Sequence, residues 1–169
     1  MPTYELKIGY QLPGDRYYQN FKDRKGFSDV VIIEISLNDI LCDTDRCELQ
    51  ISTKPLRVCT LEDIIAEKLR ALLQQIPRRR SRPQDVFDIA SMVRRHGATL
   101  DLEKVSDFLV RKSAARQVVA IKSAFNDSVS ERALVGYEEV VLRSTTKIIP
   151  FDEAWEEVLA LVSRLSIPT

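Results

Sequence analysis

The chain lacks a net charge, because its 25 basic and 25 acidic residues cancel. No overall field therefore draws it to nucleic acid or to a membrane surface, and any attraction for phosphate must be local. It also lacks an apolar run of 18 residues and a recognisable signal peptide, and it has only three cysteines. These absences argue against a membrane-spanning helix and a disulfide scaffold, and we expect a cytoplasmic protein.

A zinc site is not favoured either. The candidate ligands are Cys42, Cys47, Cys59 and the one histidine, His96. The gap from Cys42 to Cys47 is wider than the usual spacing of a ligand pair, and His96 lies far along the chain. With 169 residues, of which 44% are hydrophobic, the chain is long enough to bury a core in one domain or in two small lobes.

The first 59 residues indicate β-structure. Residues 4–12, YELKIGYQL, place apolar side chains at alternate positions, which is the period of a half-buried strand. A turn-rich connection leads to residues 29–36, DVVIIEIS, a β-branched run typical of a central strand. Shorter strands are predicted at 47–53 and 56–59.

From Thr60 onward the apolar spacing becomes helical. Thr60 and Asp63 have the spacing of a capping box at the start of a helix over residues 61–76, which a proline ends. A second helix is predicted from about Gln84 to His96, with Gly97 as a left-handed cap. Further helices are expected over residues 101–112, 114–125, 130–143 and 151–165. The predicted architecture is α+β, a sheet-rich lobe over residues 1–59 packed on a helical lobe over residues 60–169.

Lys68 is an unusual residue on the first of these helices. On a helical wheel it falls within an arc of about 180° that otherwise holds leucine and isoleucine, while Glu67 and Arg70 project to the opposite, solvated face. Two interpretations are open. The stem of Lys68 packs while its ammonium reaches water, or the ammonium is held at the edge of a cleft for a phosphate or a carboxylate.

Asp85 lies beside the apolar face of the second helix, whereas Asp88 is expected on the opposite face. An acid in the first helical turn is favoured by the helix dipole, so Asp85 also has a purely structural interpretation. A lysine and an aspartate on helices joined by a short loop would face each other, as charged pairs do in ligand sites.

The loop that joins these two helices carries four arginines. It is either solvated or contacts a nucleotide or an RNA backbone. Its arginines are Arg78, Arg79, Arg80 and Arg82.

These segments resemble the signature of the AbiEii/AbiGii toxin family of nucleotidyltransferase-like proteins. The resemblance rests on TLEDIIAEKLRALLQQ (60–75), RPQDVFDIA (82–90), the strand VVIIEIS (30–36) and a C-terminal PF-x-x-A element (150–154). It implies a nucleotidyltransferase-type active site between a mixed sheet and a helical lobe, in a toxin of a bacterial toxin–antitoxin or phage-defence system. It also implies the use of an NTP with Mg²⁺ and an acceptor such as tRNA or another RNA.

The resemblance assigns roles to particular residues. Lys68 matches the lysine that contacts triphosphate, and Asp85 and Asp88 match the family's acid pair, so these three are the candidate catalytic residues. Glu34 matches the third metal-binding carboxylate. An acid in a strand buried on both faces is costly unless it serves a metal or a hydrogen bond, whereas a solvent-facing position needs neither. The candidate nucleotide-binding residues are Lys68, Arg78, Arg79, Arg80 and Arg82.

Two departures from the family pattern shape the expected activity. Gln84 replaces the arginine of the family's R-D pair, so one fixed cation is absent. The chain also has no Gly-Ser dipeptide before a D-x-D strand, the element that supplies two of three metal carboxylates in these enzymes. Asp43 and Asp45 spell D-x-D but follow Glu34, and we expect them in a turn. We therefore predict a truncated or degenerate member with weak or no catalysis alone.

Two alternatives stay open. In the first, the true start lies upstream or a separate chain supplies the missing strand and acids, so that the enzyme is intact. In the second, the chain is a non-catalytic interaction module that forms a homodimer or binds an antitoxin-like partner. A sheet that lacks its first strands would leave an edge to be covered, which favours such pairing.

Overall fold

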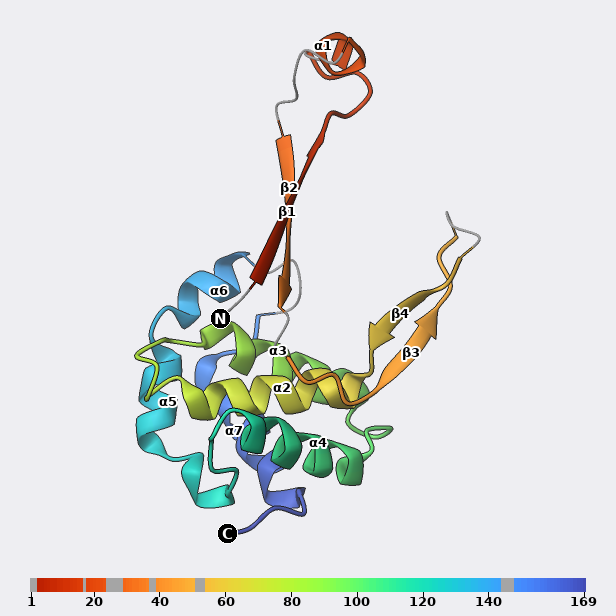
Figure 1. The fold of residues 1–169 in the computed structure, drawn as a ribbon. Helices are drawn as coiled ribbons and strands as arrows, with labels where there is room; N and C mark the ends of the chain where they lie inside the picture. Colours follow the sequence, from red (N-terminus) through yellow and green to blue (C-terminus); the bar gives the residue numbers. More distant parts are fainter. Residues whose placement is uncertain (1–2, 17, 24–28, 37–38, 51–53, 144–147) are drawn as a thin grey trace. The chain divides into compact units, whose positions relative to one another are not determined.

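The computed structural model describes residues 3–16, 18–23, 29–36, 39–50, 54–143 and 148–169, and its architecture is α+β (Figure 1). The chain divides into two compact units, Met1–Asp39 and Ile40–Thr169. Among the described residues, no helix has both the length and the apolar character needed to cross a bilayer.

The first unit is an antiparallel ribbon with one short helix. β1 (Thr3–Tyr10) pairs with β2 (Asp29–Ser36), and α1 (Tyr18–Lys22) lies in their connection. β2 has the bounds predicted from its sequence, but it is not a buried central strand. Within the described residues it has one partner strand, and all its positions are exposed. A β-branched run favours a strand without specifying what covers that strand.

The second unit begins with a hairpin of β3 (Thr44–Cys47) and β4 (Leu56–Cys59). β4 lies where a strand is predicted, but β3 ends where the strand predicted over 47–53 begins, and residues 51–53 lie outside the described residues. The turn predicted for Asp45 is wrong, because Asp45 pairs with Val58 in this hairpin. The Thr60 N–H donates to the Asp43 carbonyl at 3.4 Å, which ties the hairpin to the helices.

The first two long helices follow their predicted signals. α2 (Leu61–Gln74) is capped by Thr60, whose hydroxyl accepts from the Asp63 N–H at 3.3 Å. α3 (Pro83–His96) starts at its proline. Gly97 is not left-handed, since its φ of −58° continues the right-handed turn. The solvated position predicted for Arg70 is also wrong, because Arg70 is 7% exposed and its guanidinium bonds Glu67 and Gln74.

The later helices differ more from prediction. α4 (Leu102–Ala115) is followed by a turn at Gln117 (φ 55°), so the helix predicted over 114–125 is absent apart from a 3-10 turn at Lys122–Ala124. The helix predicted over 130–143 is two, α5 (Asp127–Leu134) and α6 (Tyr137–Arg143). Gly136 separates them with a φ of 84°, which glycine adopts at little cost. α7 (Phe151–Arg164) begins after Pro150, as predicted.

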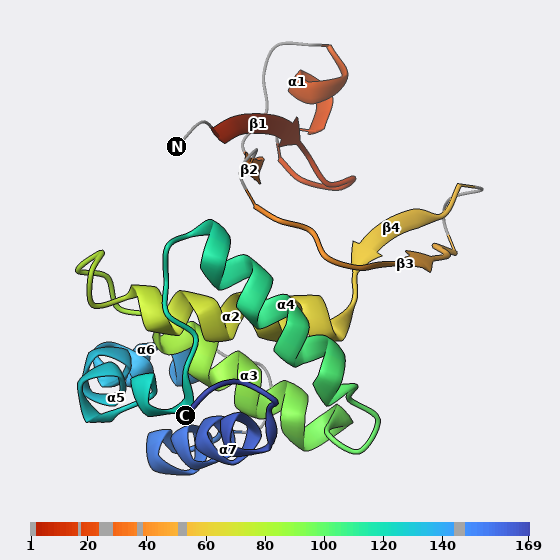
Figure 2. The ribbon, with the colours of Figure 1, turned by 60° about the horizontal axis from the view of Figure 1, so that its bottom comes forward.

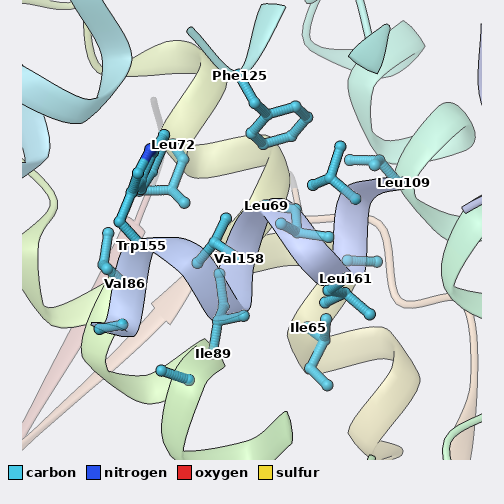
Figure 3. Close-up of a cluster of buried hydrophobic side chains, with 14 of the residues drawn as sticks. Ile65, Leu69, Leu72, Val86, Ile89, Leu109, Phe125, Trp155, Val158 and Leu161 are labelled. Atoms are coloured by element: carbon cyan, nitrogen blue, oxygen red, sulfur yellow. The ribbon is translucent and has the colours of Figure 1, made fainter. Parts of the chain in front are cut away.

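One core holds the helical unit together. α4 packs against α2, α7 packs against α3, and α2 contacts α3 (Figure 2). Because interiors are close-packed, this core fixes the rotation of α2 and α3 about their axes, and with it the direction of their polar side chains. Figure 3 shows the cluster, whose fully buried members include Ile65, Leu69, Leu72, Val86, Ile89, Leu109, Val158 and Leu161.

Candidate functional site

Lys68 on α2 reaches the first turns of α3 and meets two carboxylates there. Its ammonium nitrogen lies 2.9 Å from Oδ1 of Asp85 and 2.7 Å from Oδ2 of Asp88. The predicted pairing of Lys68 with Asp85 is therefore confirmed. The prediction that Asp88 points to the opposite face is wrong, because residues three apart on a helix lie on neighbouring positions of one face and both can reach the same cation.

The environment of Lys68 is partly screened from water. Its side chain is 21% exposed, against 11% for Asp85 and 29% for Asp88. Burial by itself would lower the pKa of Lys68, but the attraction of Asp85 and the hydrogen bonds to both aspartates outweigh it and raise the pKa above its ordinary value. The ammonium is thus charged at neutral pH, and the three side chains together carry one net negative charge.

Two further side chains complete this cluster. The Gln84 amide donates to Oδ1 of Asp88 at 2.6 Å, so the residue that replaces the family's arginine holds an acid of the site. Oδ2 of Asp85 is buried and has no hydrogen-bond partner among the described residues. Nε of Arg82 lies 4.0 Å from this oxygen, just beyond hydrogen-bond distance. A small rotation of Arg82 would satisfy that oxygen.

The loop arginines do not act as one group. In the part of the chain that the structure describes, Arg82 is the one of these four arginines whose guanidinium lies within 4.0 Å of an acid of the Lys68 cluster. With Arg78 and Arg80 it lines a hollow of about 10 Å³ above Gln75, which has room for about one water. Arg79 lines a different and larger hollow beside α5. The structure therefore separates Arg79 from the other three arginines of the basic run.

Glu34 lies in the other unit. It is exposed on β2, and its Cα partner across the ribbon is Glu5, whose carboxylate pairs with Lys7 at 2.8 Å. The solvent-facing interpretation of this strand position therefore describes Glu34 in the structure. Its role as a metal ligand stays a prediction.

Sequence reasoning missed a second and more deeply buried cation. Lys112 of α4 is 3% exposed and its ammonium donates to the Ile40 carbonyl and, at 3.2 Å, to the carboxylate of Asp63. The same carboxylate accepts from the Cys42 N–H at 2.8 Å. Lys112 and Asp63 thus clamp the start of the second unit onto α2 and α4. Asp63 was visible in the sequence only as a capping residue, and Lys112 near a helix end resembled an ordinary solvated lysine.

The comparisons with known proteins bear on the family of the chain and not on the role of any one residue. A family model described as nucleotidyl transferase AbiEii toxin, type IV TA system, matches residues 4–161. That span runs from β1 into α7 and contains Glu34, Lys68, Asp85 and Asp88. Neither the curated proteins nor the solved structures gave a match.

Proposed function

The chain belongs to the AbiEii nucleotidyl transferase toxin family of type IV toxin–antitoxin systems, and from this membership we propose that its helical unit binds the phosphates of an NTP through Lys68. The family expected from the AEKLRALL and QDVFD segments is thereby confirmed. A toxin of such a system has an antitoxin as its counterpart. The observation that carries the proposal is the Lys68 ammonium held between Asp85 and Asp88.

The geometry leaves Lys68 able to take a further partner. A lysine ammonium has three N–H donors, and the two aspartates use two of them. The remaining donor is available to a phosphate oxygen, since the side chain is 21% exposed. Because the aspartates already fix the lysine, little side-chain freedom is lost when phosphate binds, which favours affinity.

The two aspartates have different parts in this proposal. Asp85, the more buried one, positions Lys68 from the first turn of α3. Asp88 is more exposed and holds the lysine through one oxygen, while Gln84 donates to its other oxygen and keeps the carboxylate in place. Arg82 then approaches the unpartnered oxygen of Asp85 and offsets the negative charge of the cluster.

Magnesium stays a prediction for this chain. Mg²⁺ requires several converging oxygen ligands, and no three acidic, histidine or cysteine side chains gather in the part of the chain that the structure describes. Asp85 and Asp88 are both occupied by Lys68. The described residues therefore do not fit a resident magnesium ion. We accordingly expect nucleotide transfer to an RNA acceptor to be slow for this chain alone.

The test is a titration with a fluorescent NTP analogue. Lys68→Met should raise the dissociation constant at least about tenfold, because it removes a charge-assisted contact to phosphate. Lys104→Met is the matched control, since Lys104 is an exposed lysine that pairs with Asp43 at 3.0 Å on the same unit. Equal effects of the two substitutions would show that Lys68 has no special place in nucleotide binding.

A further inference from the structure

An open hollow lies on the helical unit beside α5. The loop after α2 reaches α5 in this region (Figure 1). Its volume is about 510 Å³, within the range of ligand sites. None of the residues that line it belongs to the Lys68 cluster. We call it the α5 groove, and it is lined by Ile76, Arg79, Ser128, Glu131, Arg132 and Val135.

The walls of the α5 groove are joined by hydrogen bonds. The Ser81 hydroxyl lies 3.0 Å from the Arg132 carbonyl and 2.7 Å from the Val135 carbonyl. In return, Nε of Arg132 donates to the Arg80 carbonyl at 3.2 Å. Below them the buried Gln75 amide donates to the Val129 carbonyl at 2.7 Å, which fastens the end of α2 to α5. The groove is therefore built from two elements that hold each other in place.

No acidic residue that the structure describes is an ion-pair partner of the arginines at this groove. Within the described residues, no carboxylate forms an ion pair with Arg79 or Arg132, nor with the adjacent Arg78 and Arg80, whereas Arg94 bonds two glutamates. In a chain of zero net charge these guanidiniums form a local positive field. A guanidinium matches the geometry of a phosphate and can bind it through two parallel hydrogen bonds.

The other residues that line the groove suit RNA better than an acidic peptide as the anionic ligand. Ile76 and Val135 are 45% and 59% exposed, so the groove offers an aliphatic surface beside its arginines, against which the flat face of a base can pack. Glu131 can accept a hydrogen bond from a ribose hydroxyl or a base amino group, donors that the carboxylate side chains of an acidic peptide lack. Phosphates, bases and hydroxyls together are the chemistry of single-stranded RNA.

We propose that the α5 groove docks a single-stranded stretch of the RNA acceptor, with phosphates on Arg79 and Arg132 and a base against Ile76 and Val135. This inference rests on the proposed function, because it supplies the acceptor to the transfer that Lys68 serves. It assigns Arg79 to RNA rather than to the NTP, and it adds Arg132 and Val135, which no sequence motif marks.

The experiment measures two affinities for each variant. Anisotropy of a fluorescein-labelled single-stranded RNA of mixed sequence reports on the groove, and the fluorescent NTP analogue reports on Lys68. Arg79→Ala should weaken RNA binding about tenfold. It should also reduce the slope of log affinity against log salt by about 0.7 and leave the NTP dissociation constant unchanged. Arg111→Ala, which removes another exposed arginine, on α4, is the control and should change neither affinity.

A second variant distinguishes a loss of RNA contacts from a loss of folding. Val135→Asp places a negative charge at an exposed position after α5 and should weaken RNA binding while keeping the wild-type urea midpoint. Unchanged RNA affinity in both groove variants would overturn the inference and leave the NTP proposal standing. Displacement of the RNA by an equimolar poly-glutamate peptide would overturn it too, in favour of an acidic protein partner. An NTP dissociation constant that is unchanged in Lys68→Met, with RNA binding weakened in the groove variants, would instead overturn the proposed function alone.

Discussion

Replacing Lys112 with methionine would remove the most deeply buried ammonium group that the structure describes. The Lys112 ammonium lies 3.2 Å from the Asp63 carboxylate, and the two side chains are 3% and 4% exposed. It also donates to the Ile40 carbonyl. Methionine has a similar length and fills the same space, so the substitution isolates the loss of the charge and its donors.

The expected cost follows from what Lys112→Met leaves behind. The Asp63 carboxylate would retain the N–H donor of Cys42 but no cation, and the Ile40 carbonyl would lose its ammonium donor. Breaking a buried ion pair by removing one partner costs about 3–5 kcal/mol. The double variant Lys112→Met, Asp63→Asn leaves no uncompensated charge, so it should cost less than the single variant.

Urea unfolding followed by fluorescence measures this directly, because the single tryptophan, Trp155, is buried in the same helical unit. With a slope of about 1–3 kcal/mol per molar urea, the midpoint should fall by at least about 1 M. A loss below about 1 kcal/mol, or a double variant whose cost equals the sum of the two single variants, would refute the account of Lys112 and Asp63 as a buried, coupled pair.

Two further predictions concern charge and pH. Asp88→Asn should tighten binding of metal-free NTP about fivefold, since removing one charge about 4 Å from a phosphate is worth about 1 kcal/mol in water-like surroundings. The control is Asp107→Asn, an exposed acid of α4, and an unchanged affinity in Asp88→Asn would contradict a phosphate bound at Lys68 beside Asp88. Burial raises the pKa of Tyr137 from 10.0 to about 12, and its hydroxyl donates to the Ile149 carbonyl at 3.0 Å. The unfolded chain loses this proton first, so Tyr137 lowers the stability of the fold as the pH rises from about 10 to about 12. Absorbance titration should show one late tyrosine that disappears in Tyr137→Phe, and its persistence there would refute the assignment.

The elements that the sequence predicts well are those with local signals. α2 has its capping threonine, α7 has its preceding proline, and β2 has an unbroken β-branched run, so their bounds follow from short stretches of chain. Residues 114–125 lack such signals. There the apolar spacing fits a helix, but the chain turns at Gln117 with a φ of 55°. A left-handed residue other than glycine depends on tertiary contacts that no local pattern reports.

In the candidate site, too, the contact with a local sequence signal was predicted and the contacts set by helix packing were not. The wheel places Lys68 at the edge of the apolar face of α2, and this is enough to predict that it meets the acid on the next helix. Asp88 was assigned to the opposite face although it lies three residues after Asp85, a spacing at which both acids can reach one lysine on the neighbouring helix. The Lys112–Asp63 pair joins residues 49 positions apart, and such a contact is set by the packing of α4 on α2.

The central claim is that the Lys68 ammonium contacts a phosphate of the bound NTP. Solid-state NMR can test it through the dipolar coupling between ¹⁵N-labelled lysine ammonium groups and the ³¹P nuclei of bound NTP at saturation. A charge-assisted contact of about 2.7–2.9 Å to a phosphate oxygen places nitrogen within about 4 Å of phosphorus. A coupling of that size should appear in the wild type and in Lys104→Met and vanish in Lys68→Met. A coupling that persists without Lys68 would contradict the claim.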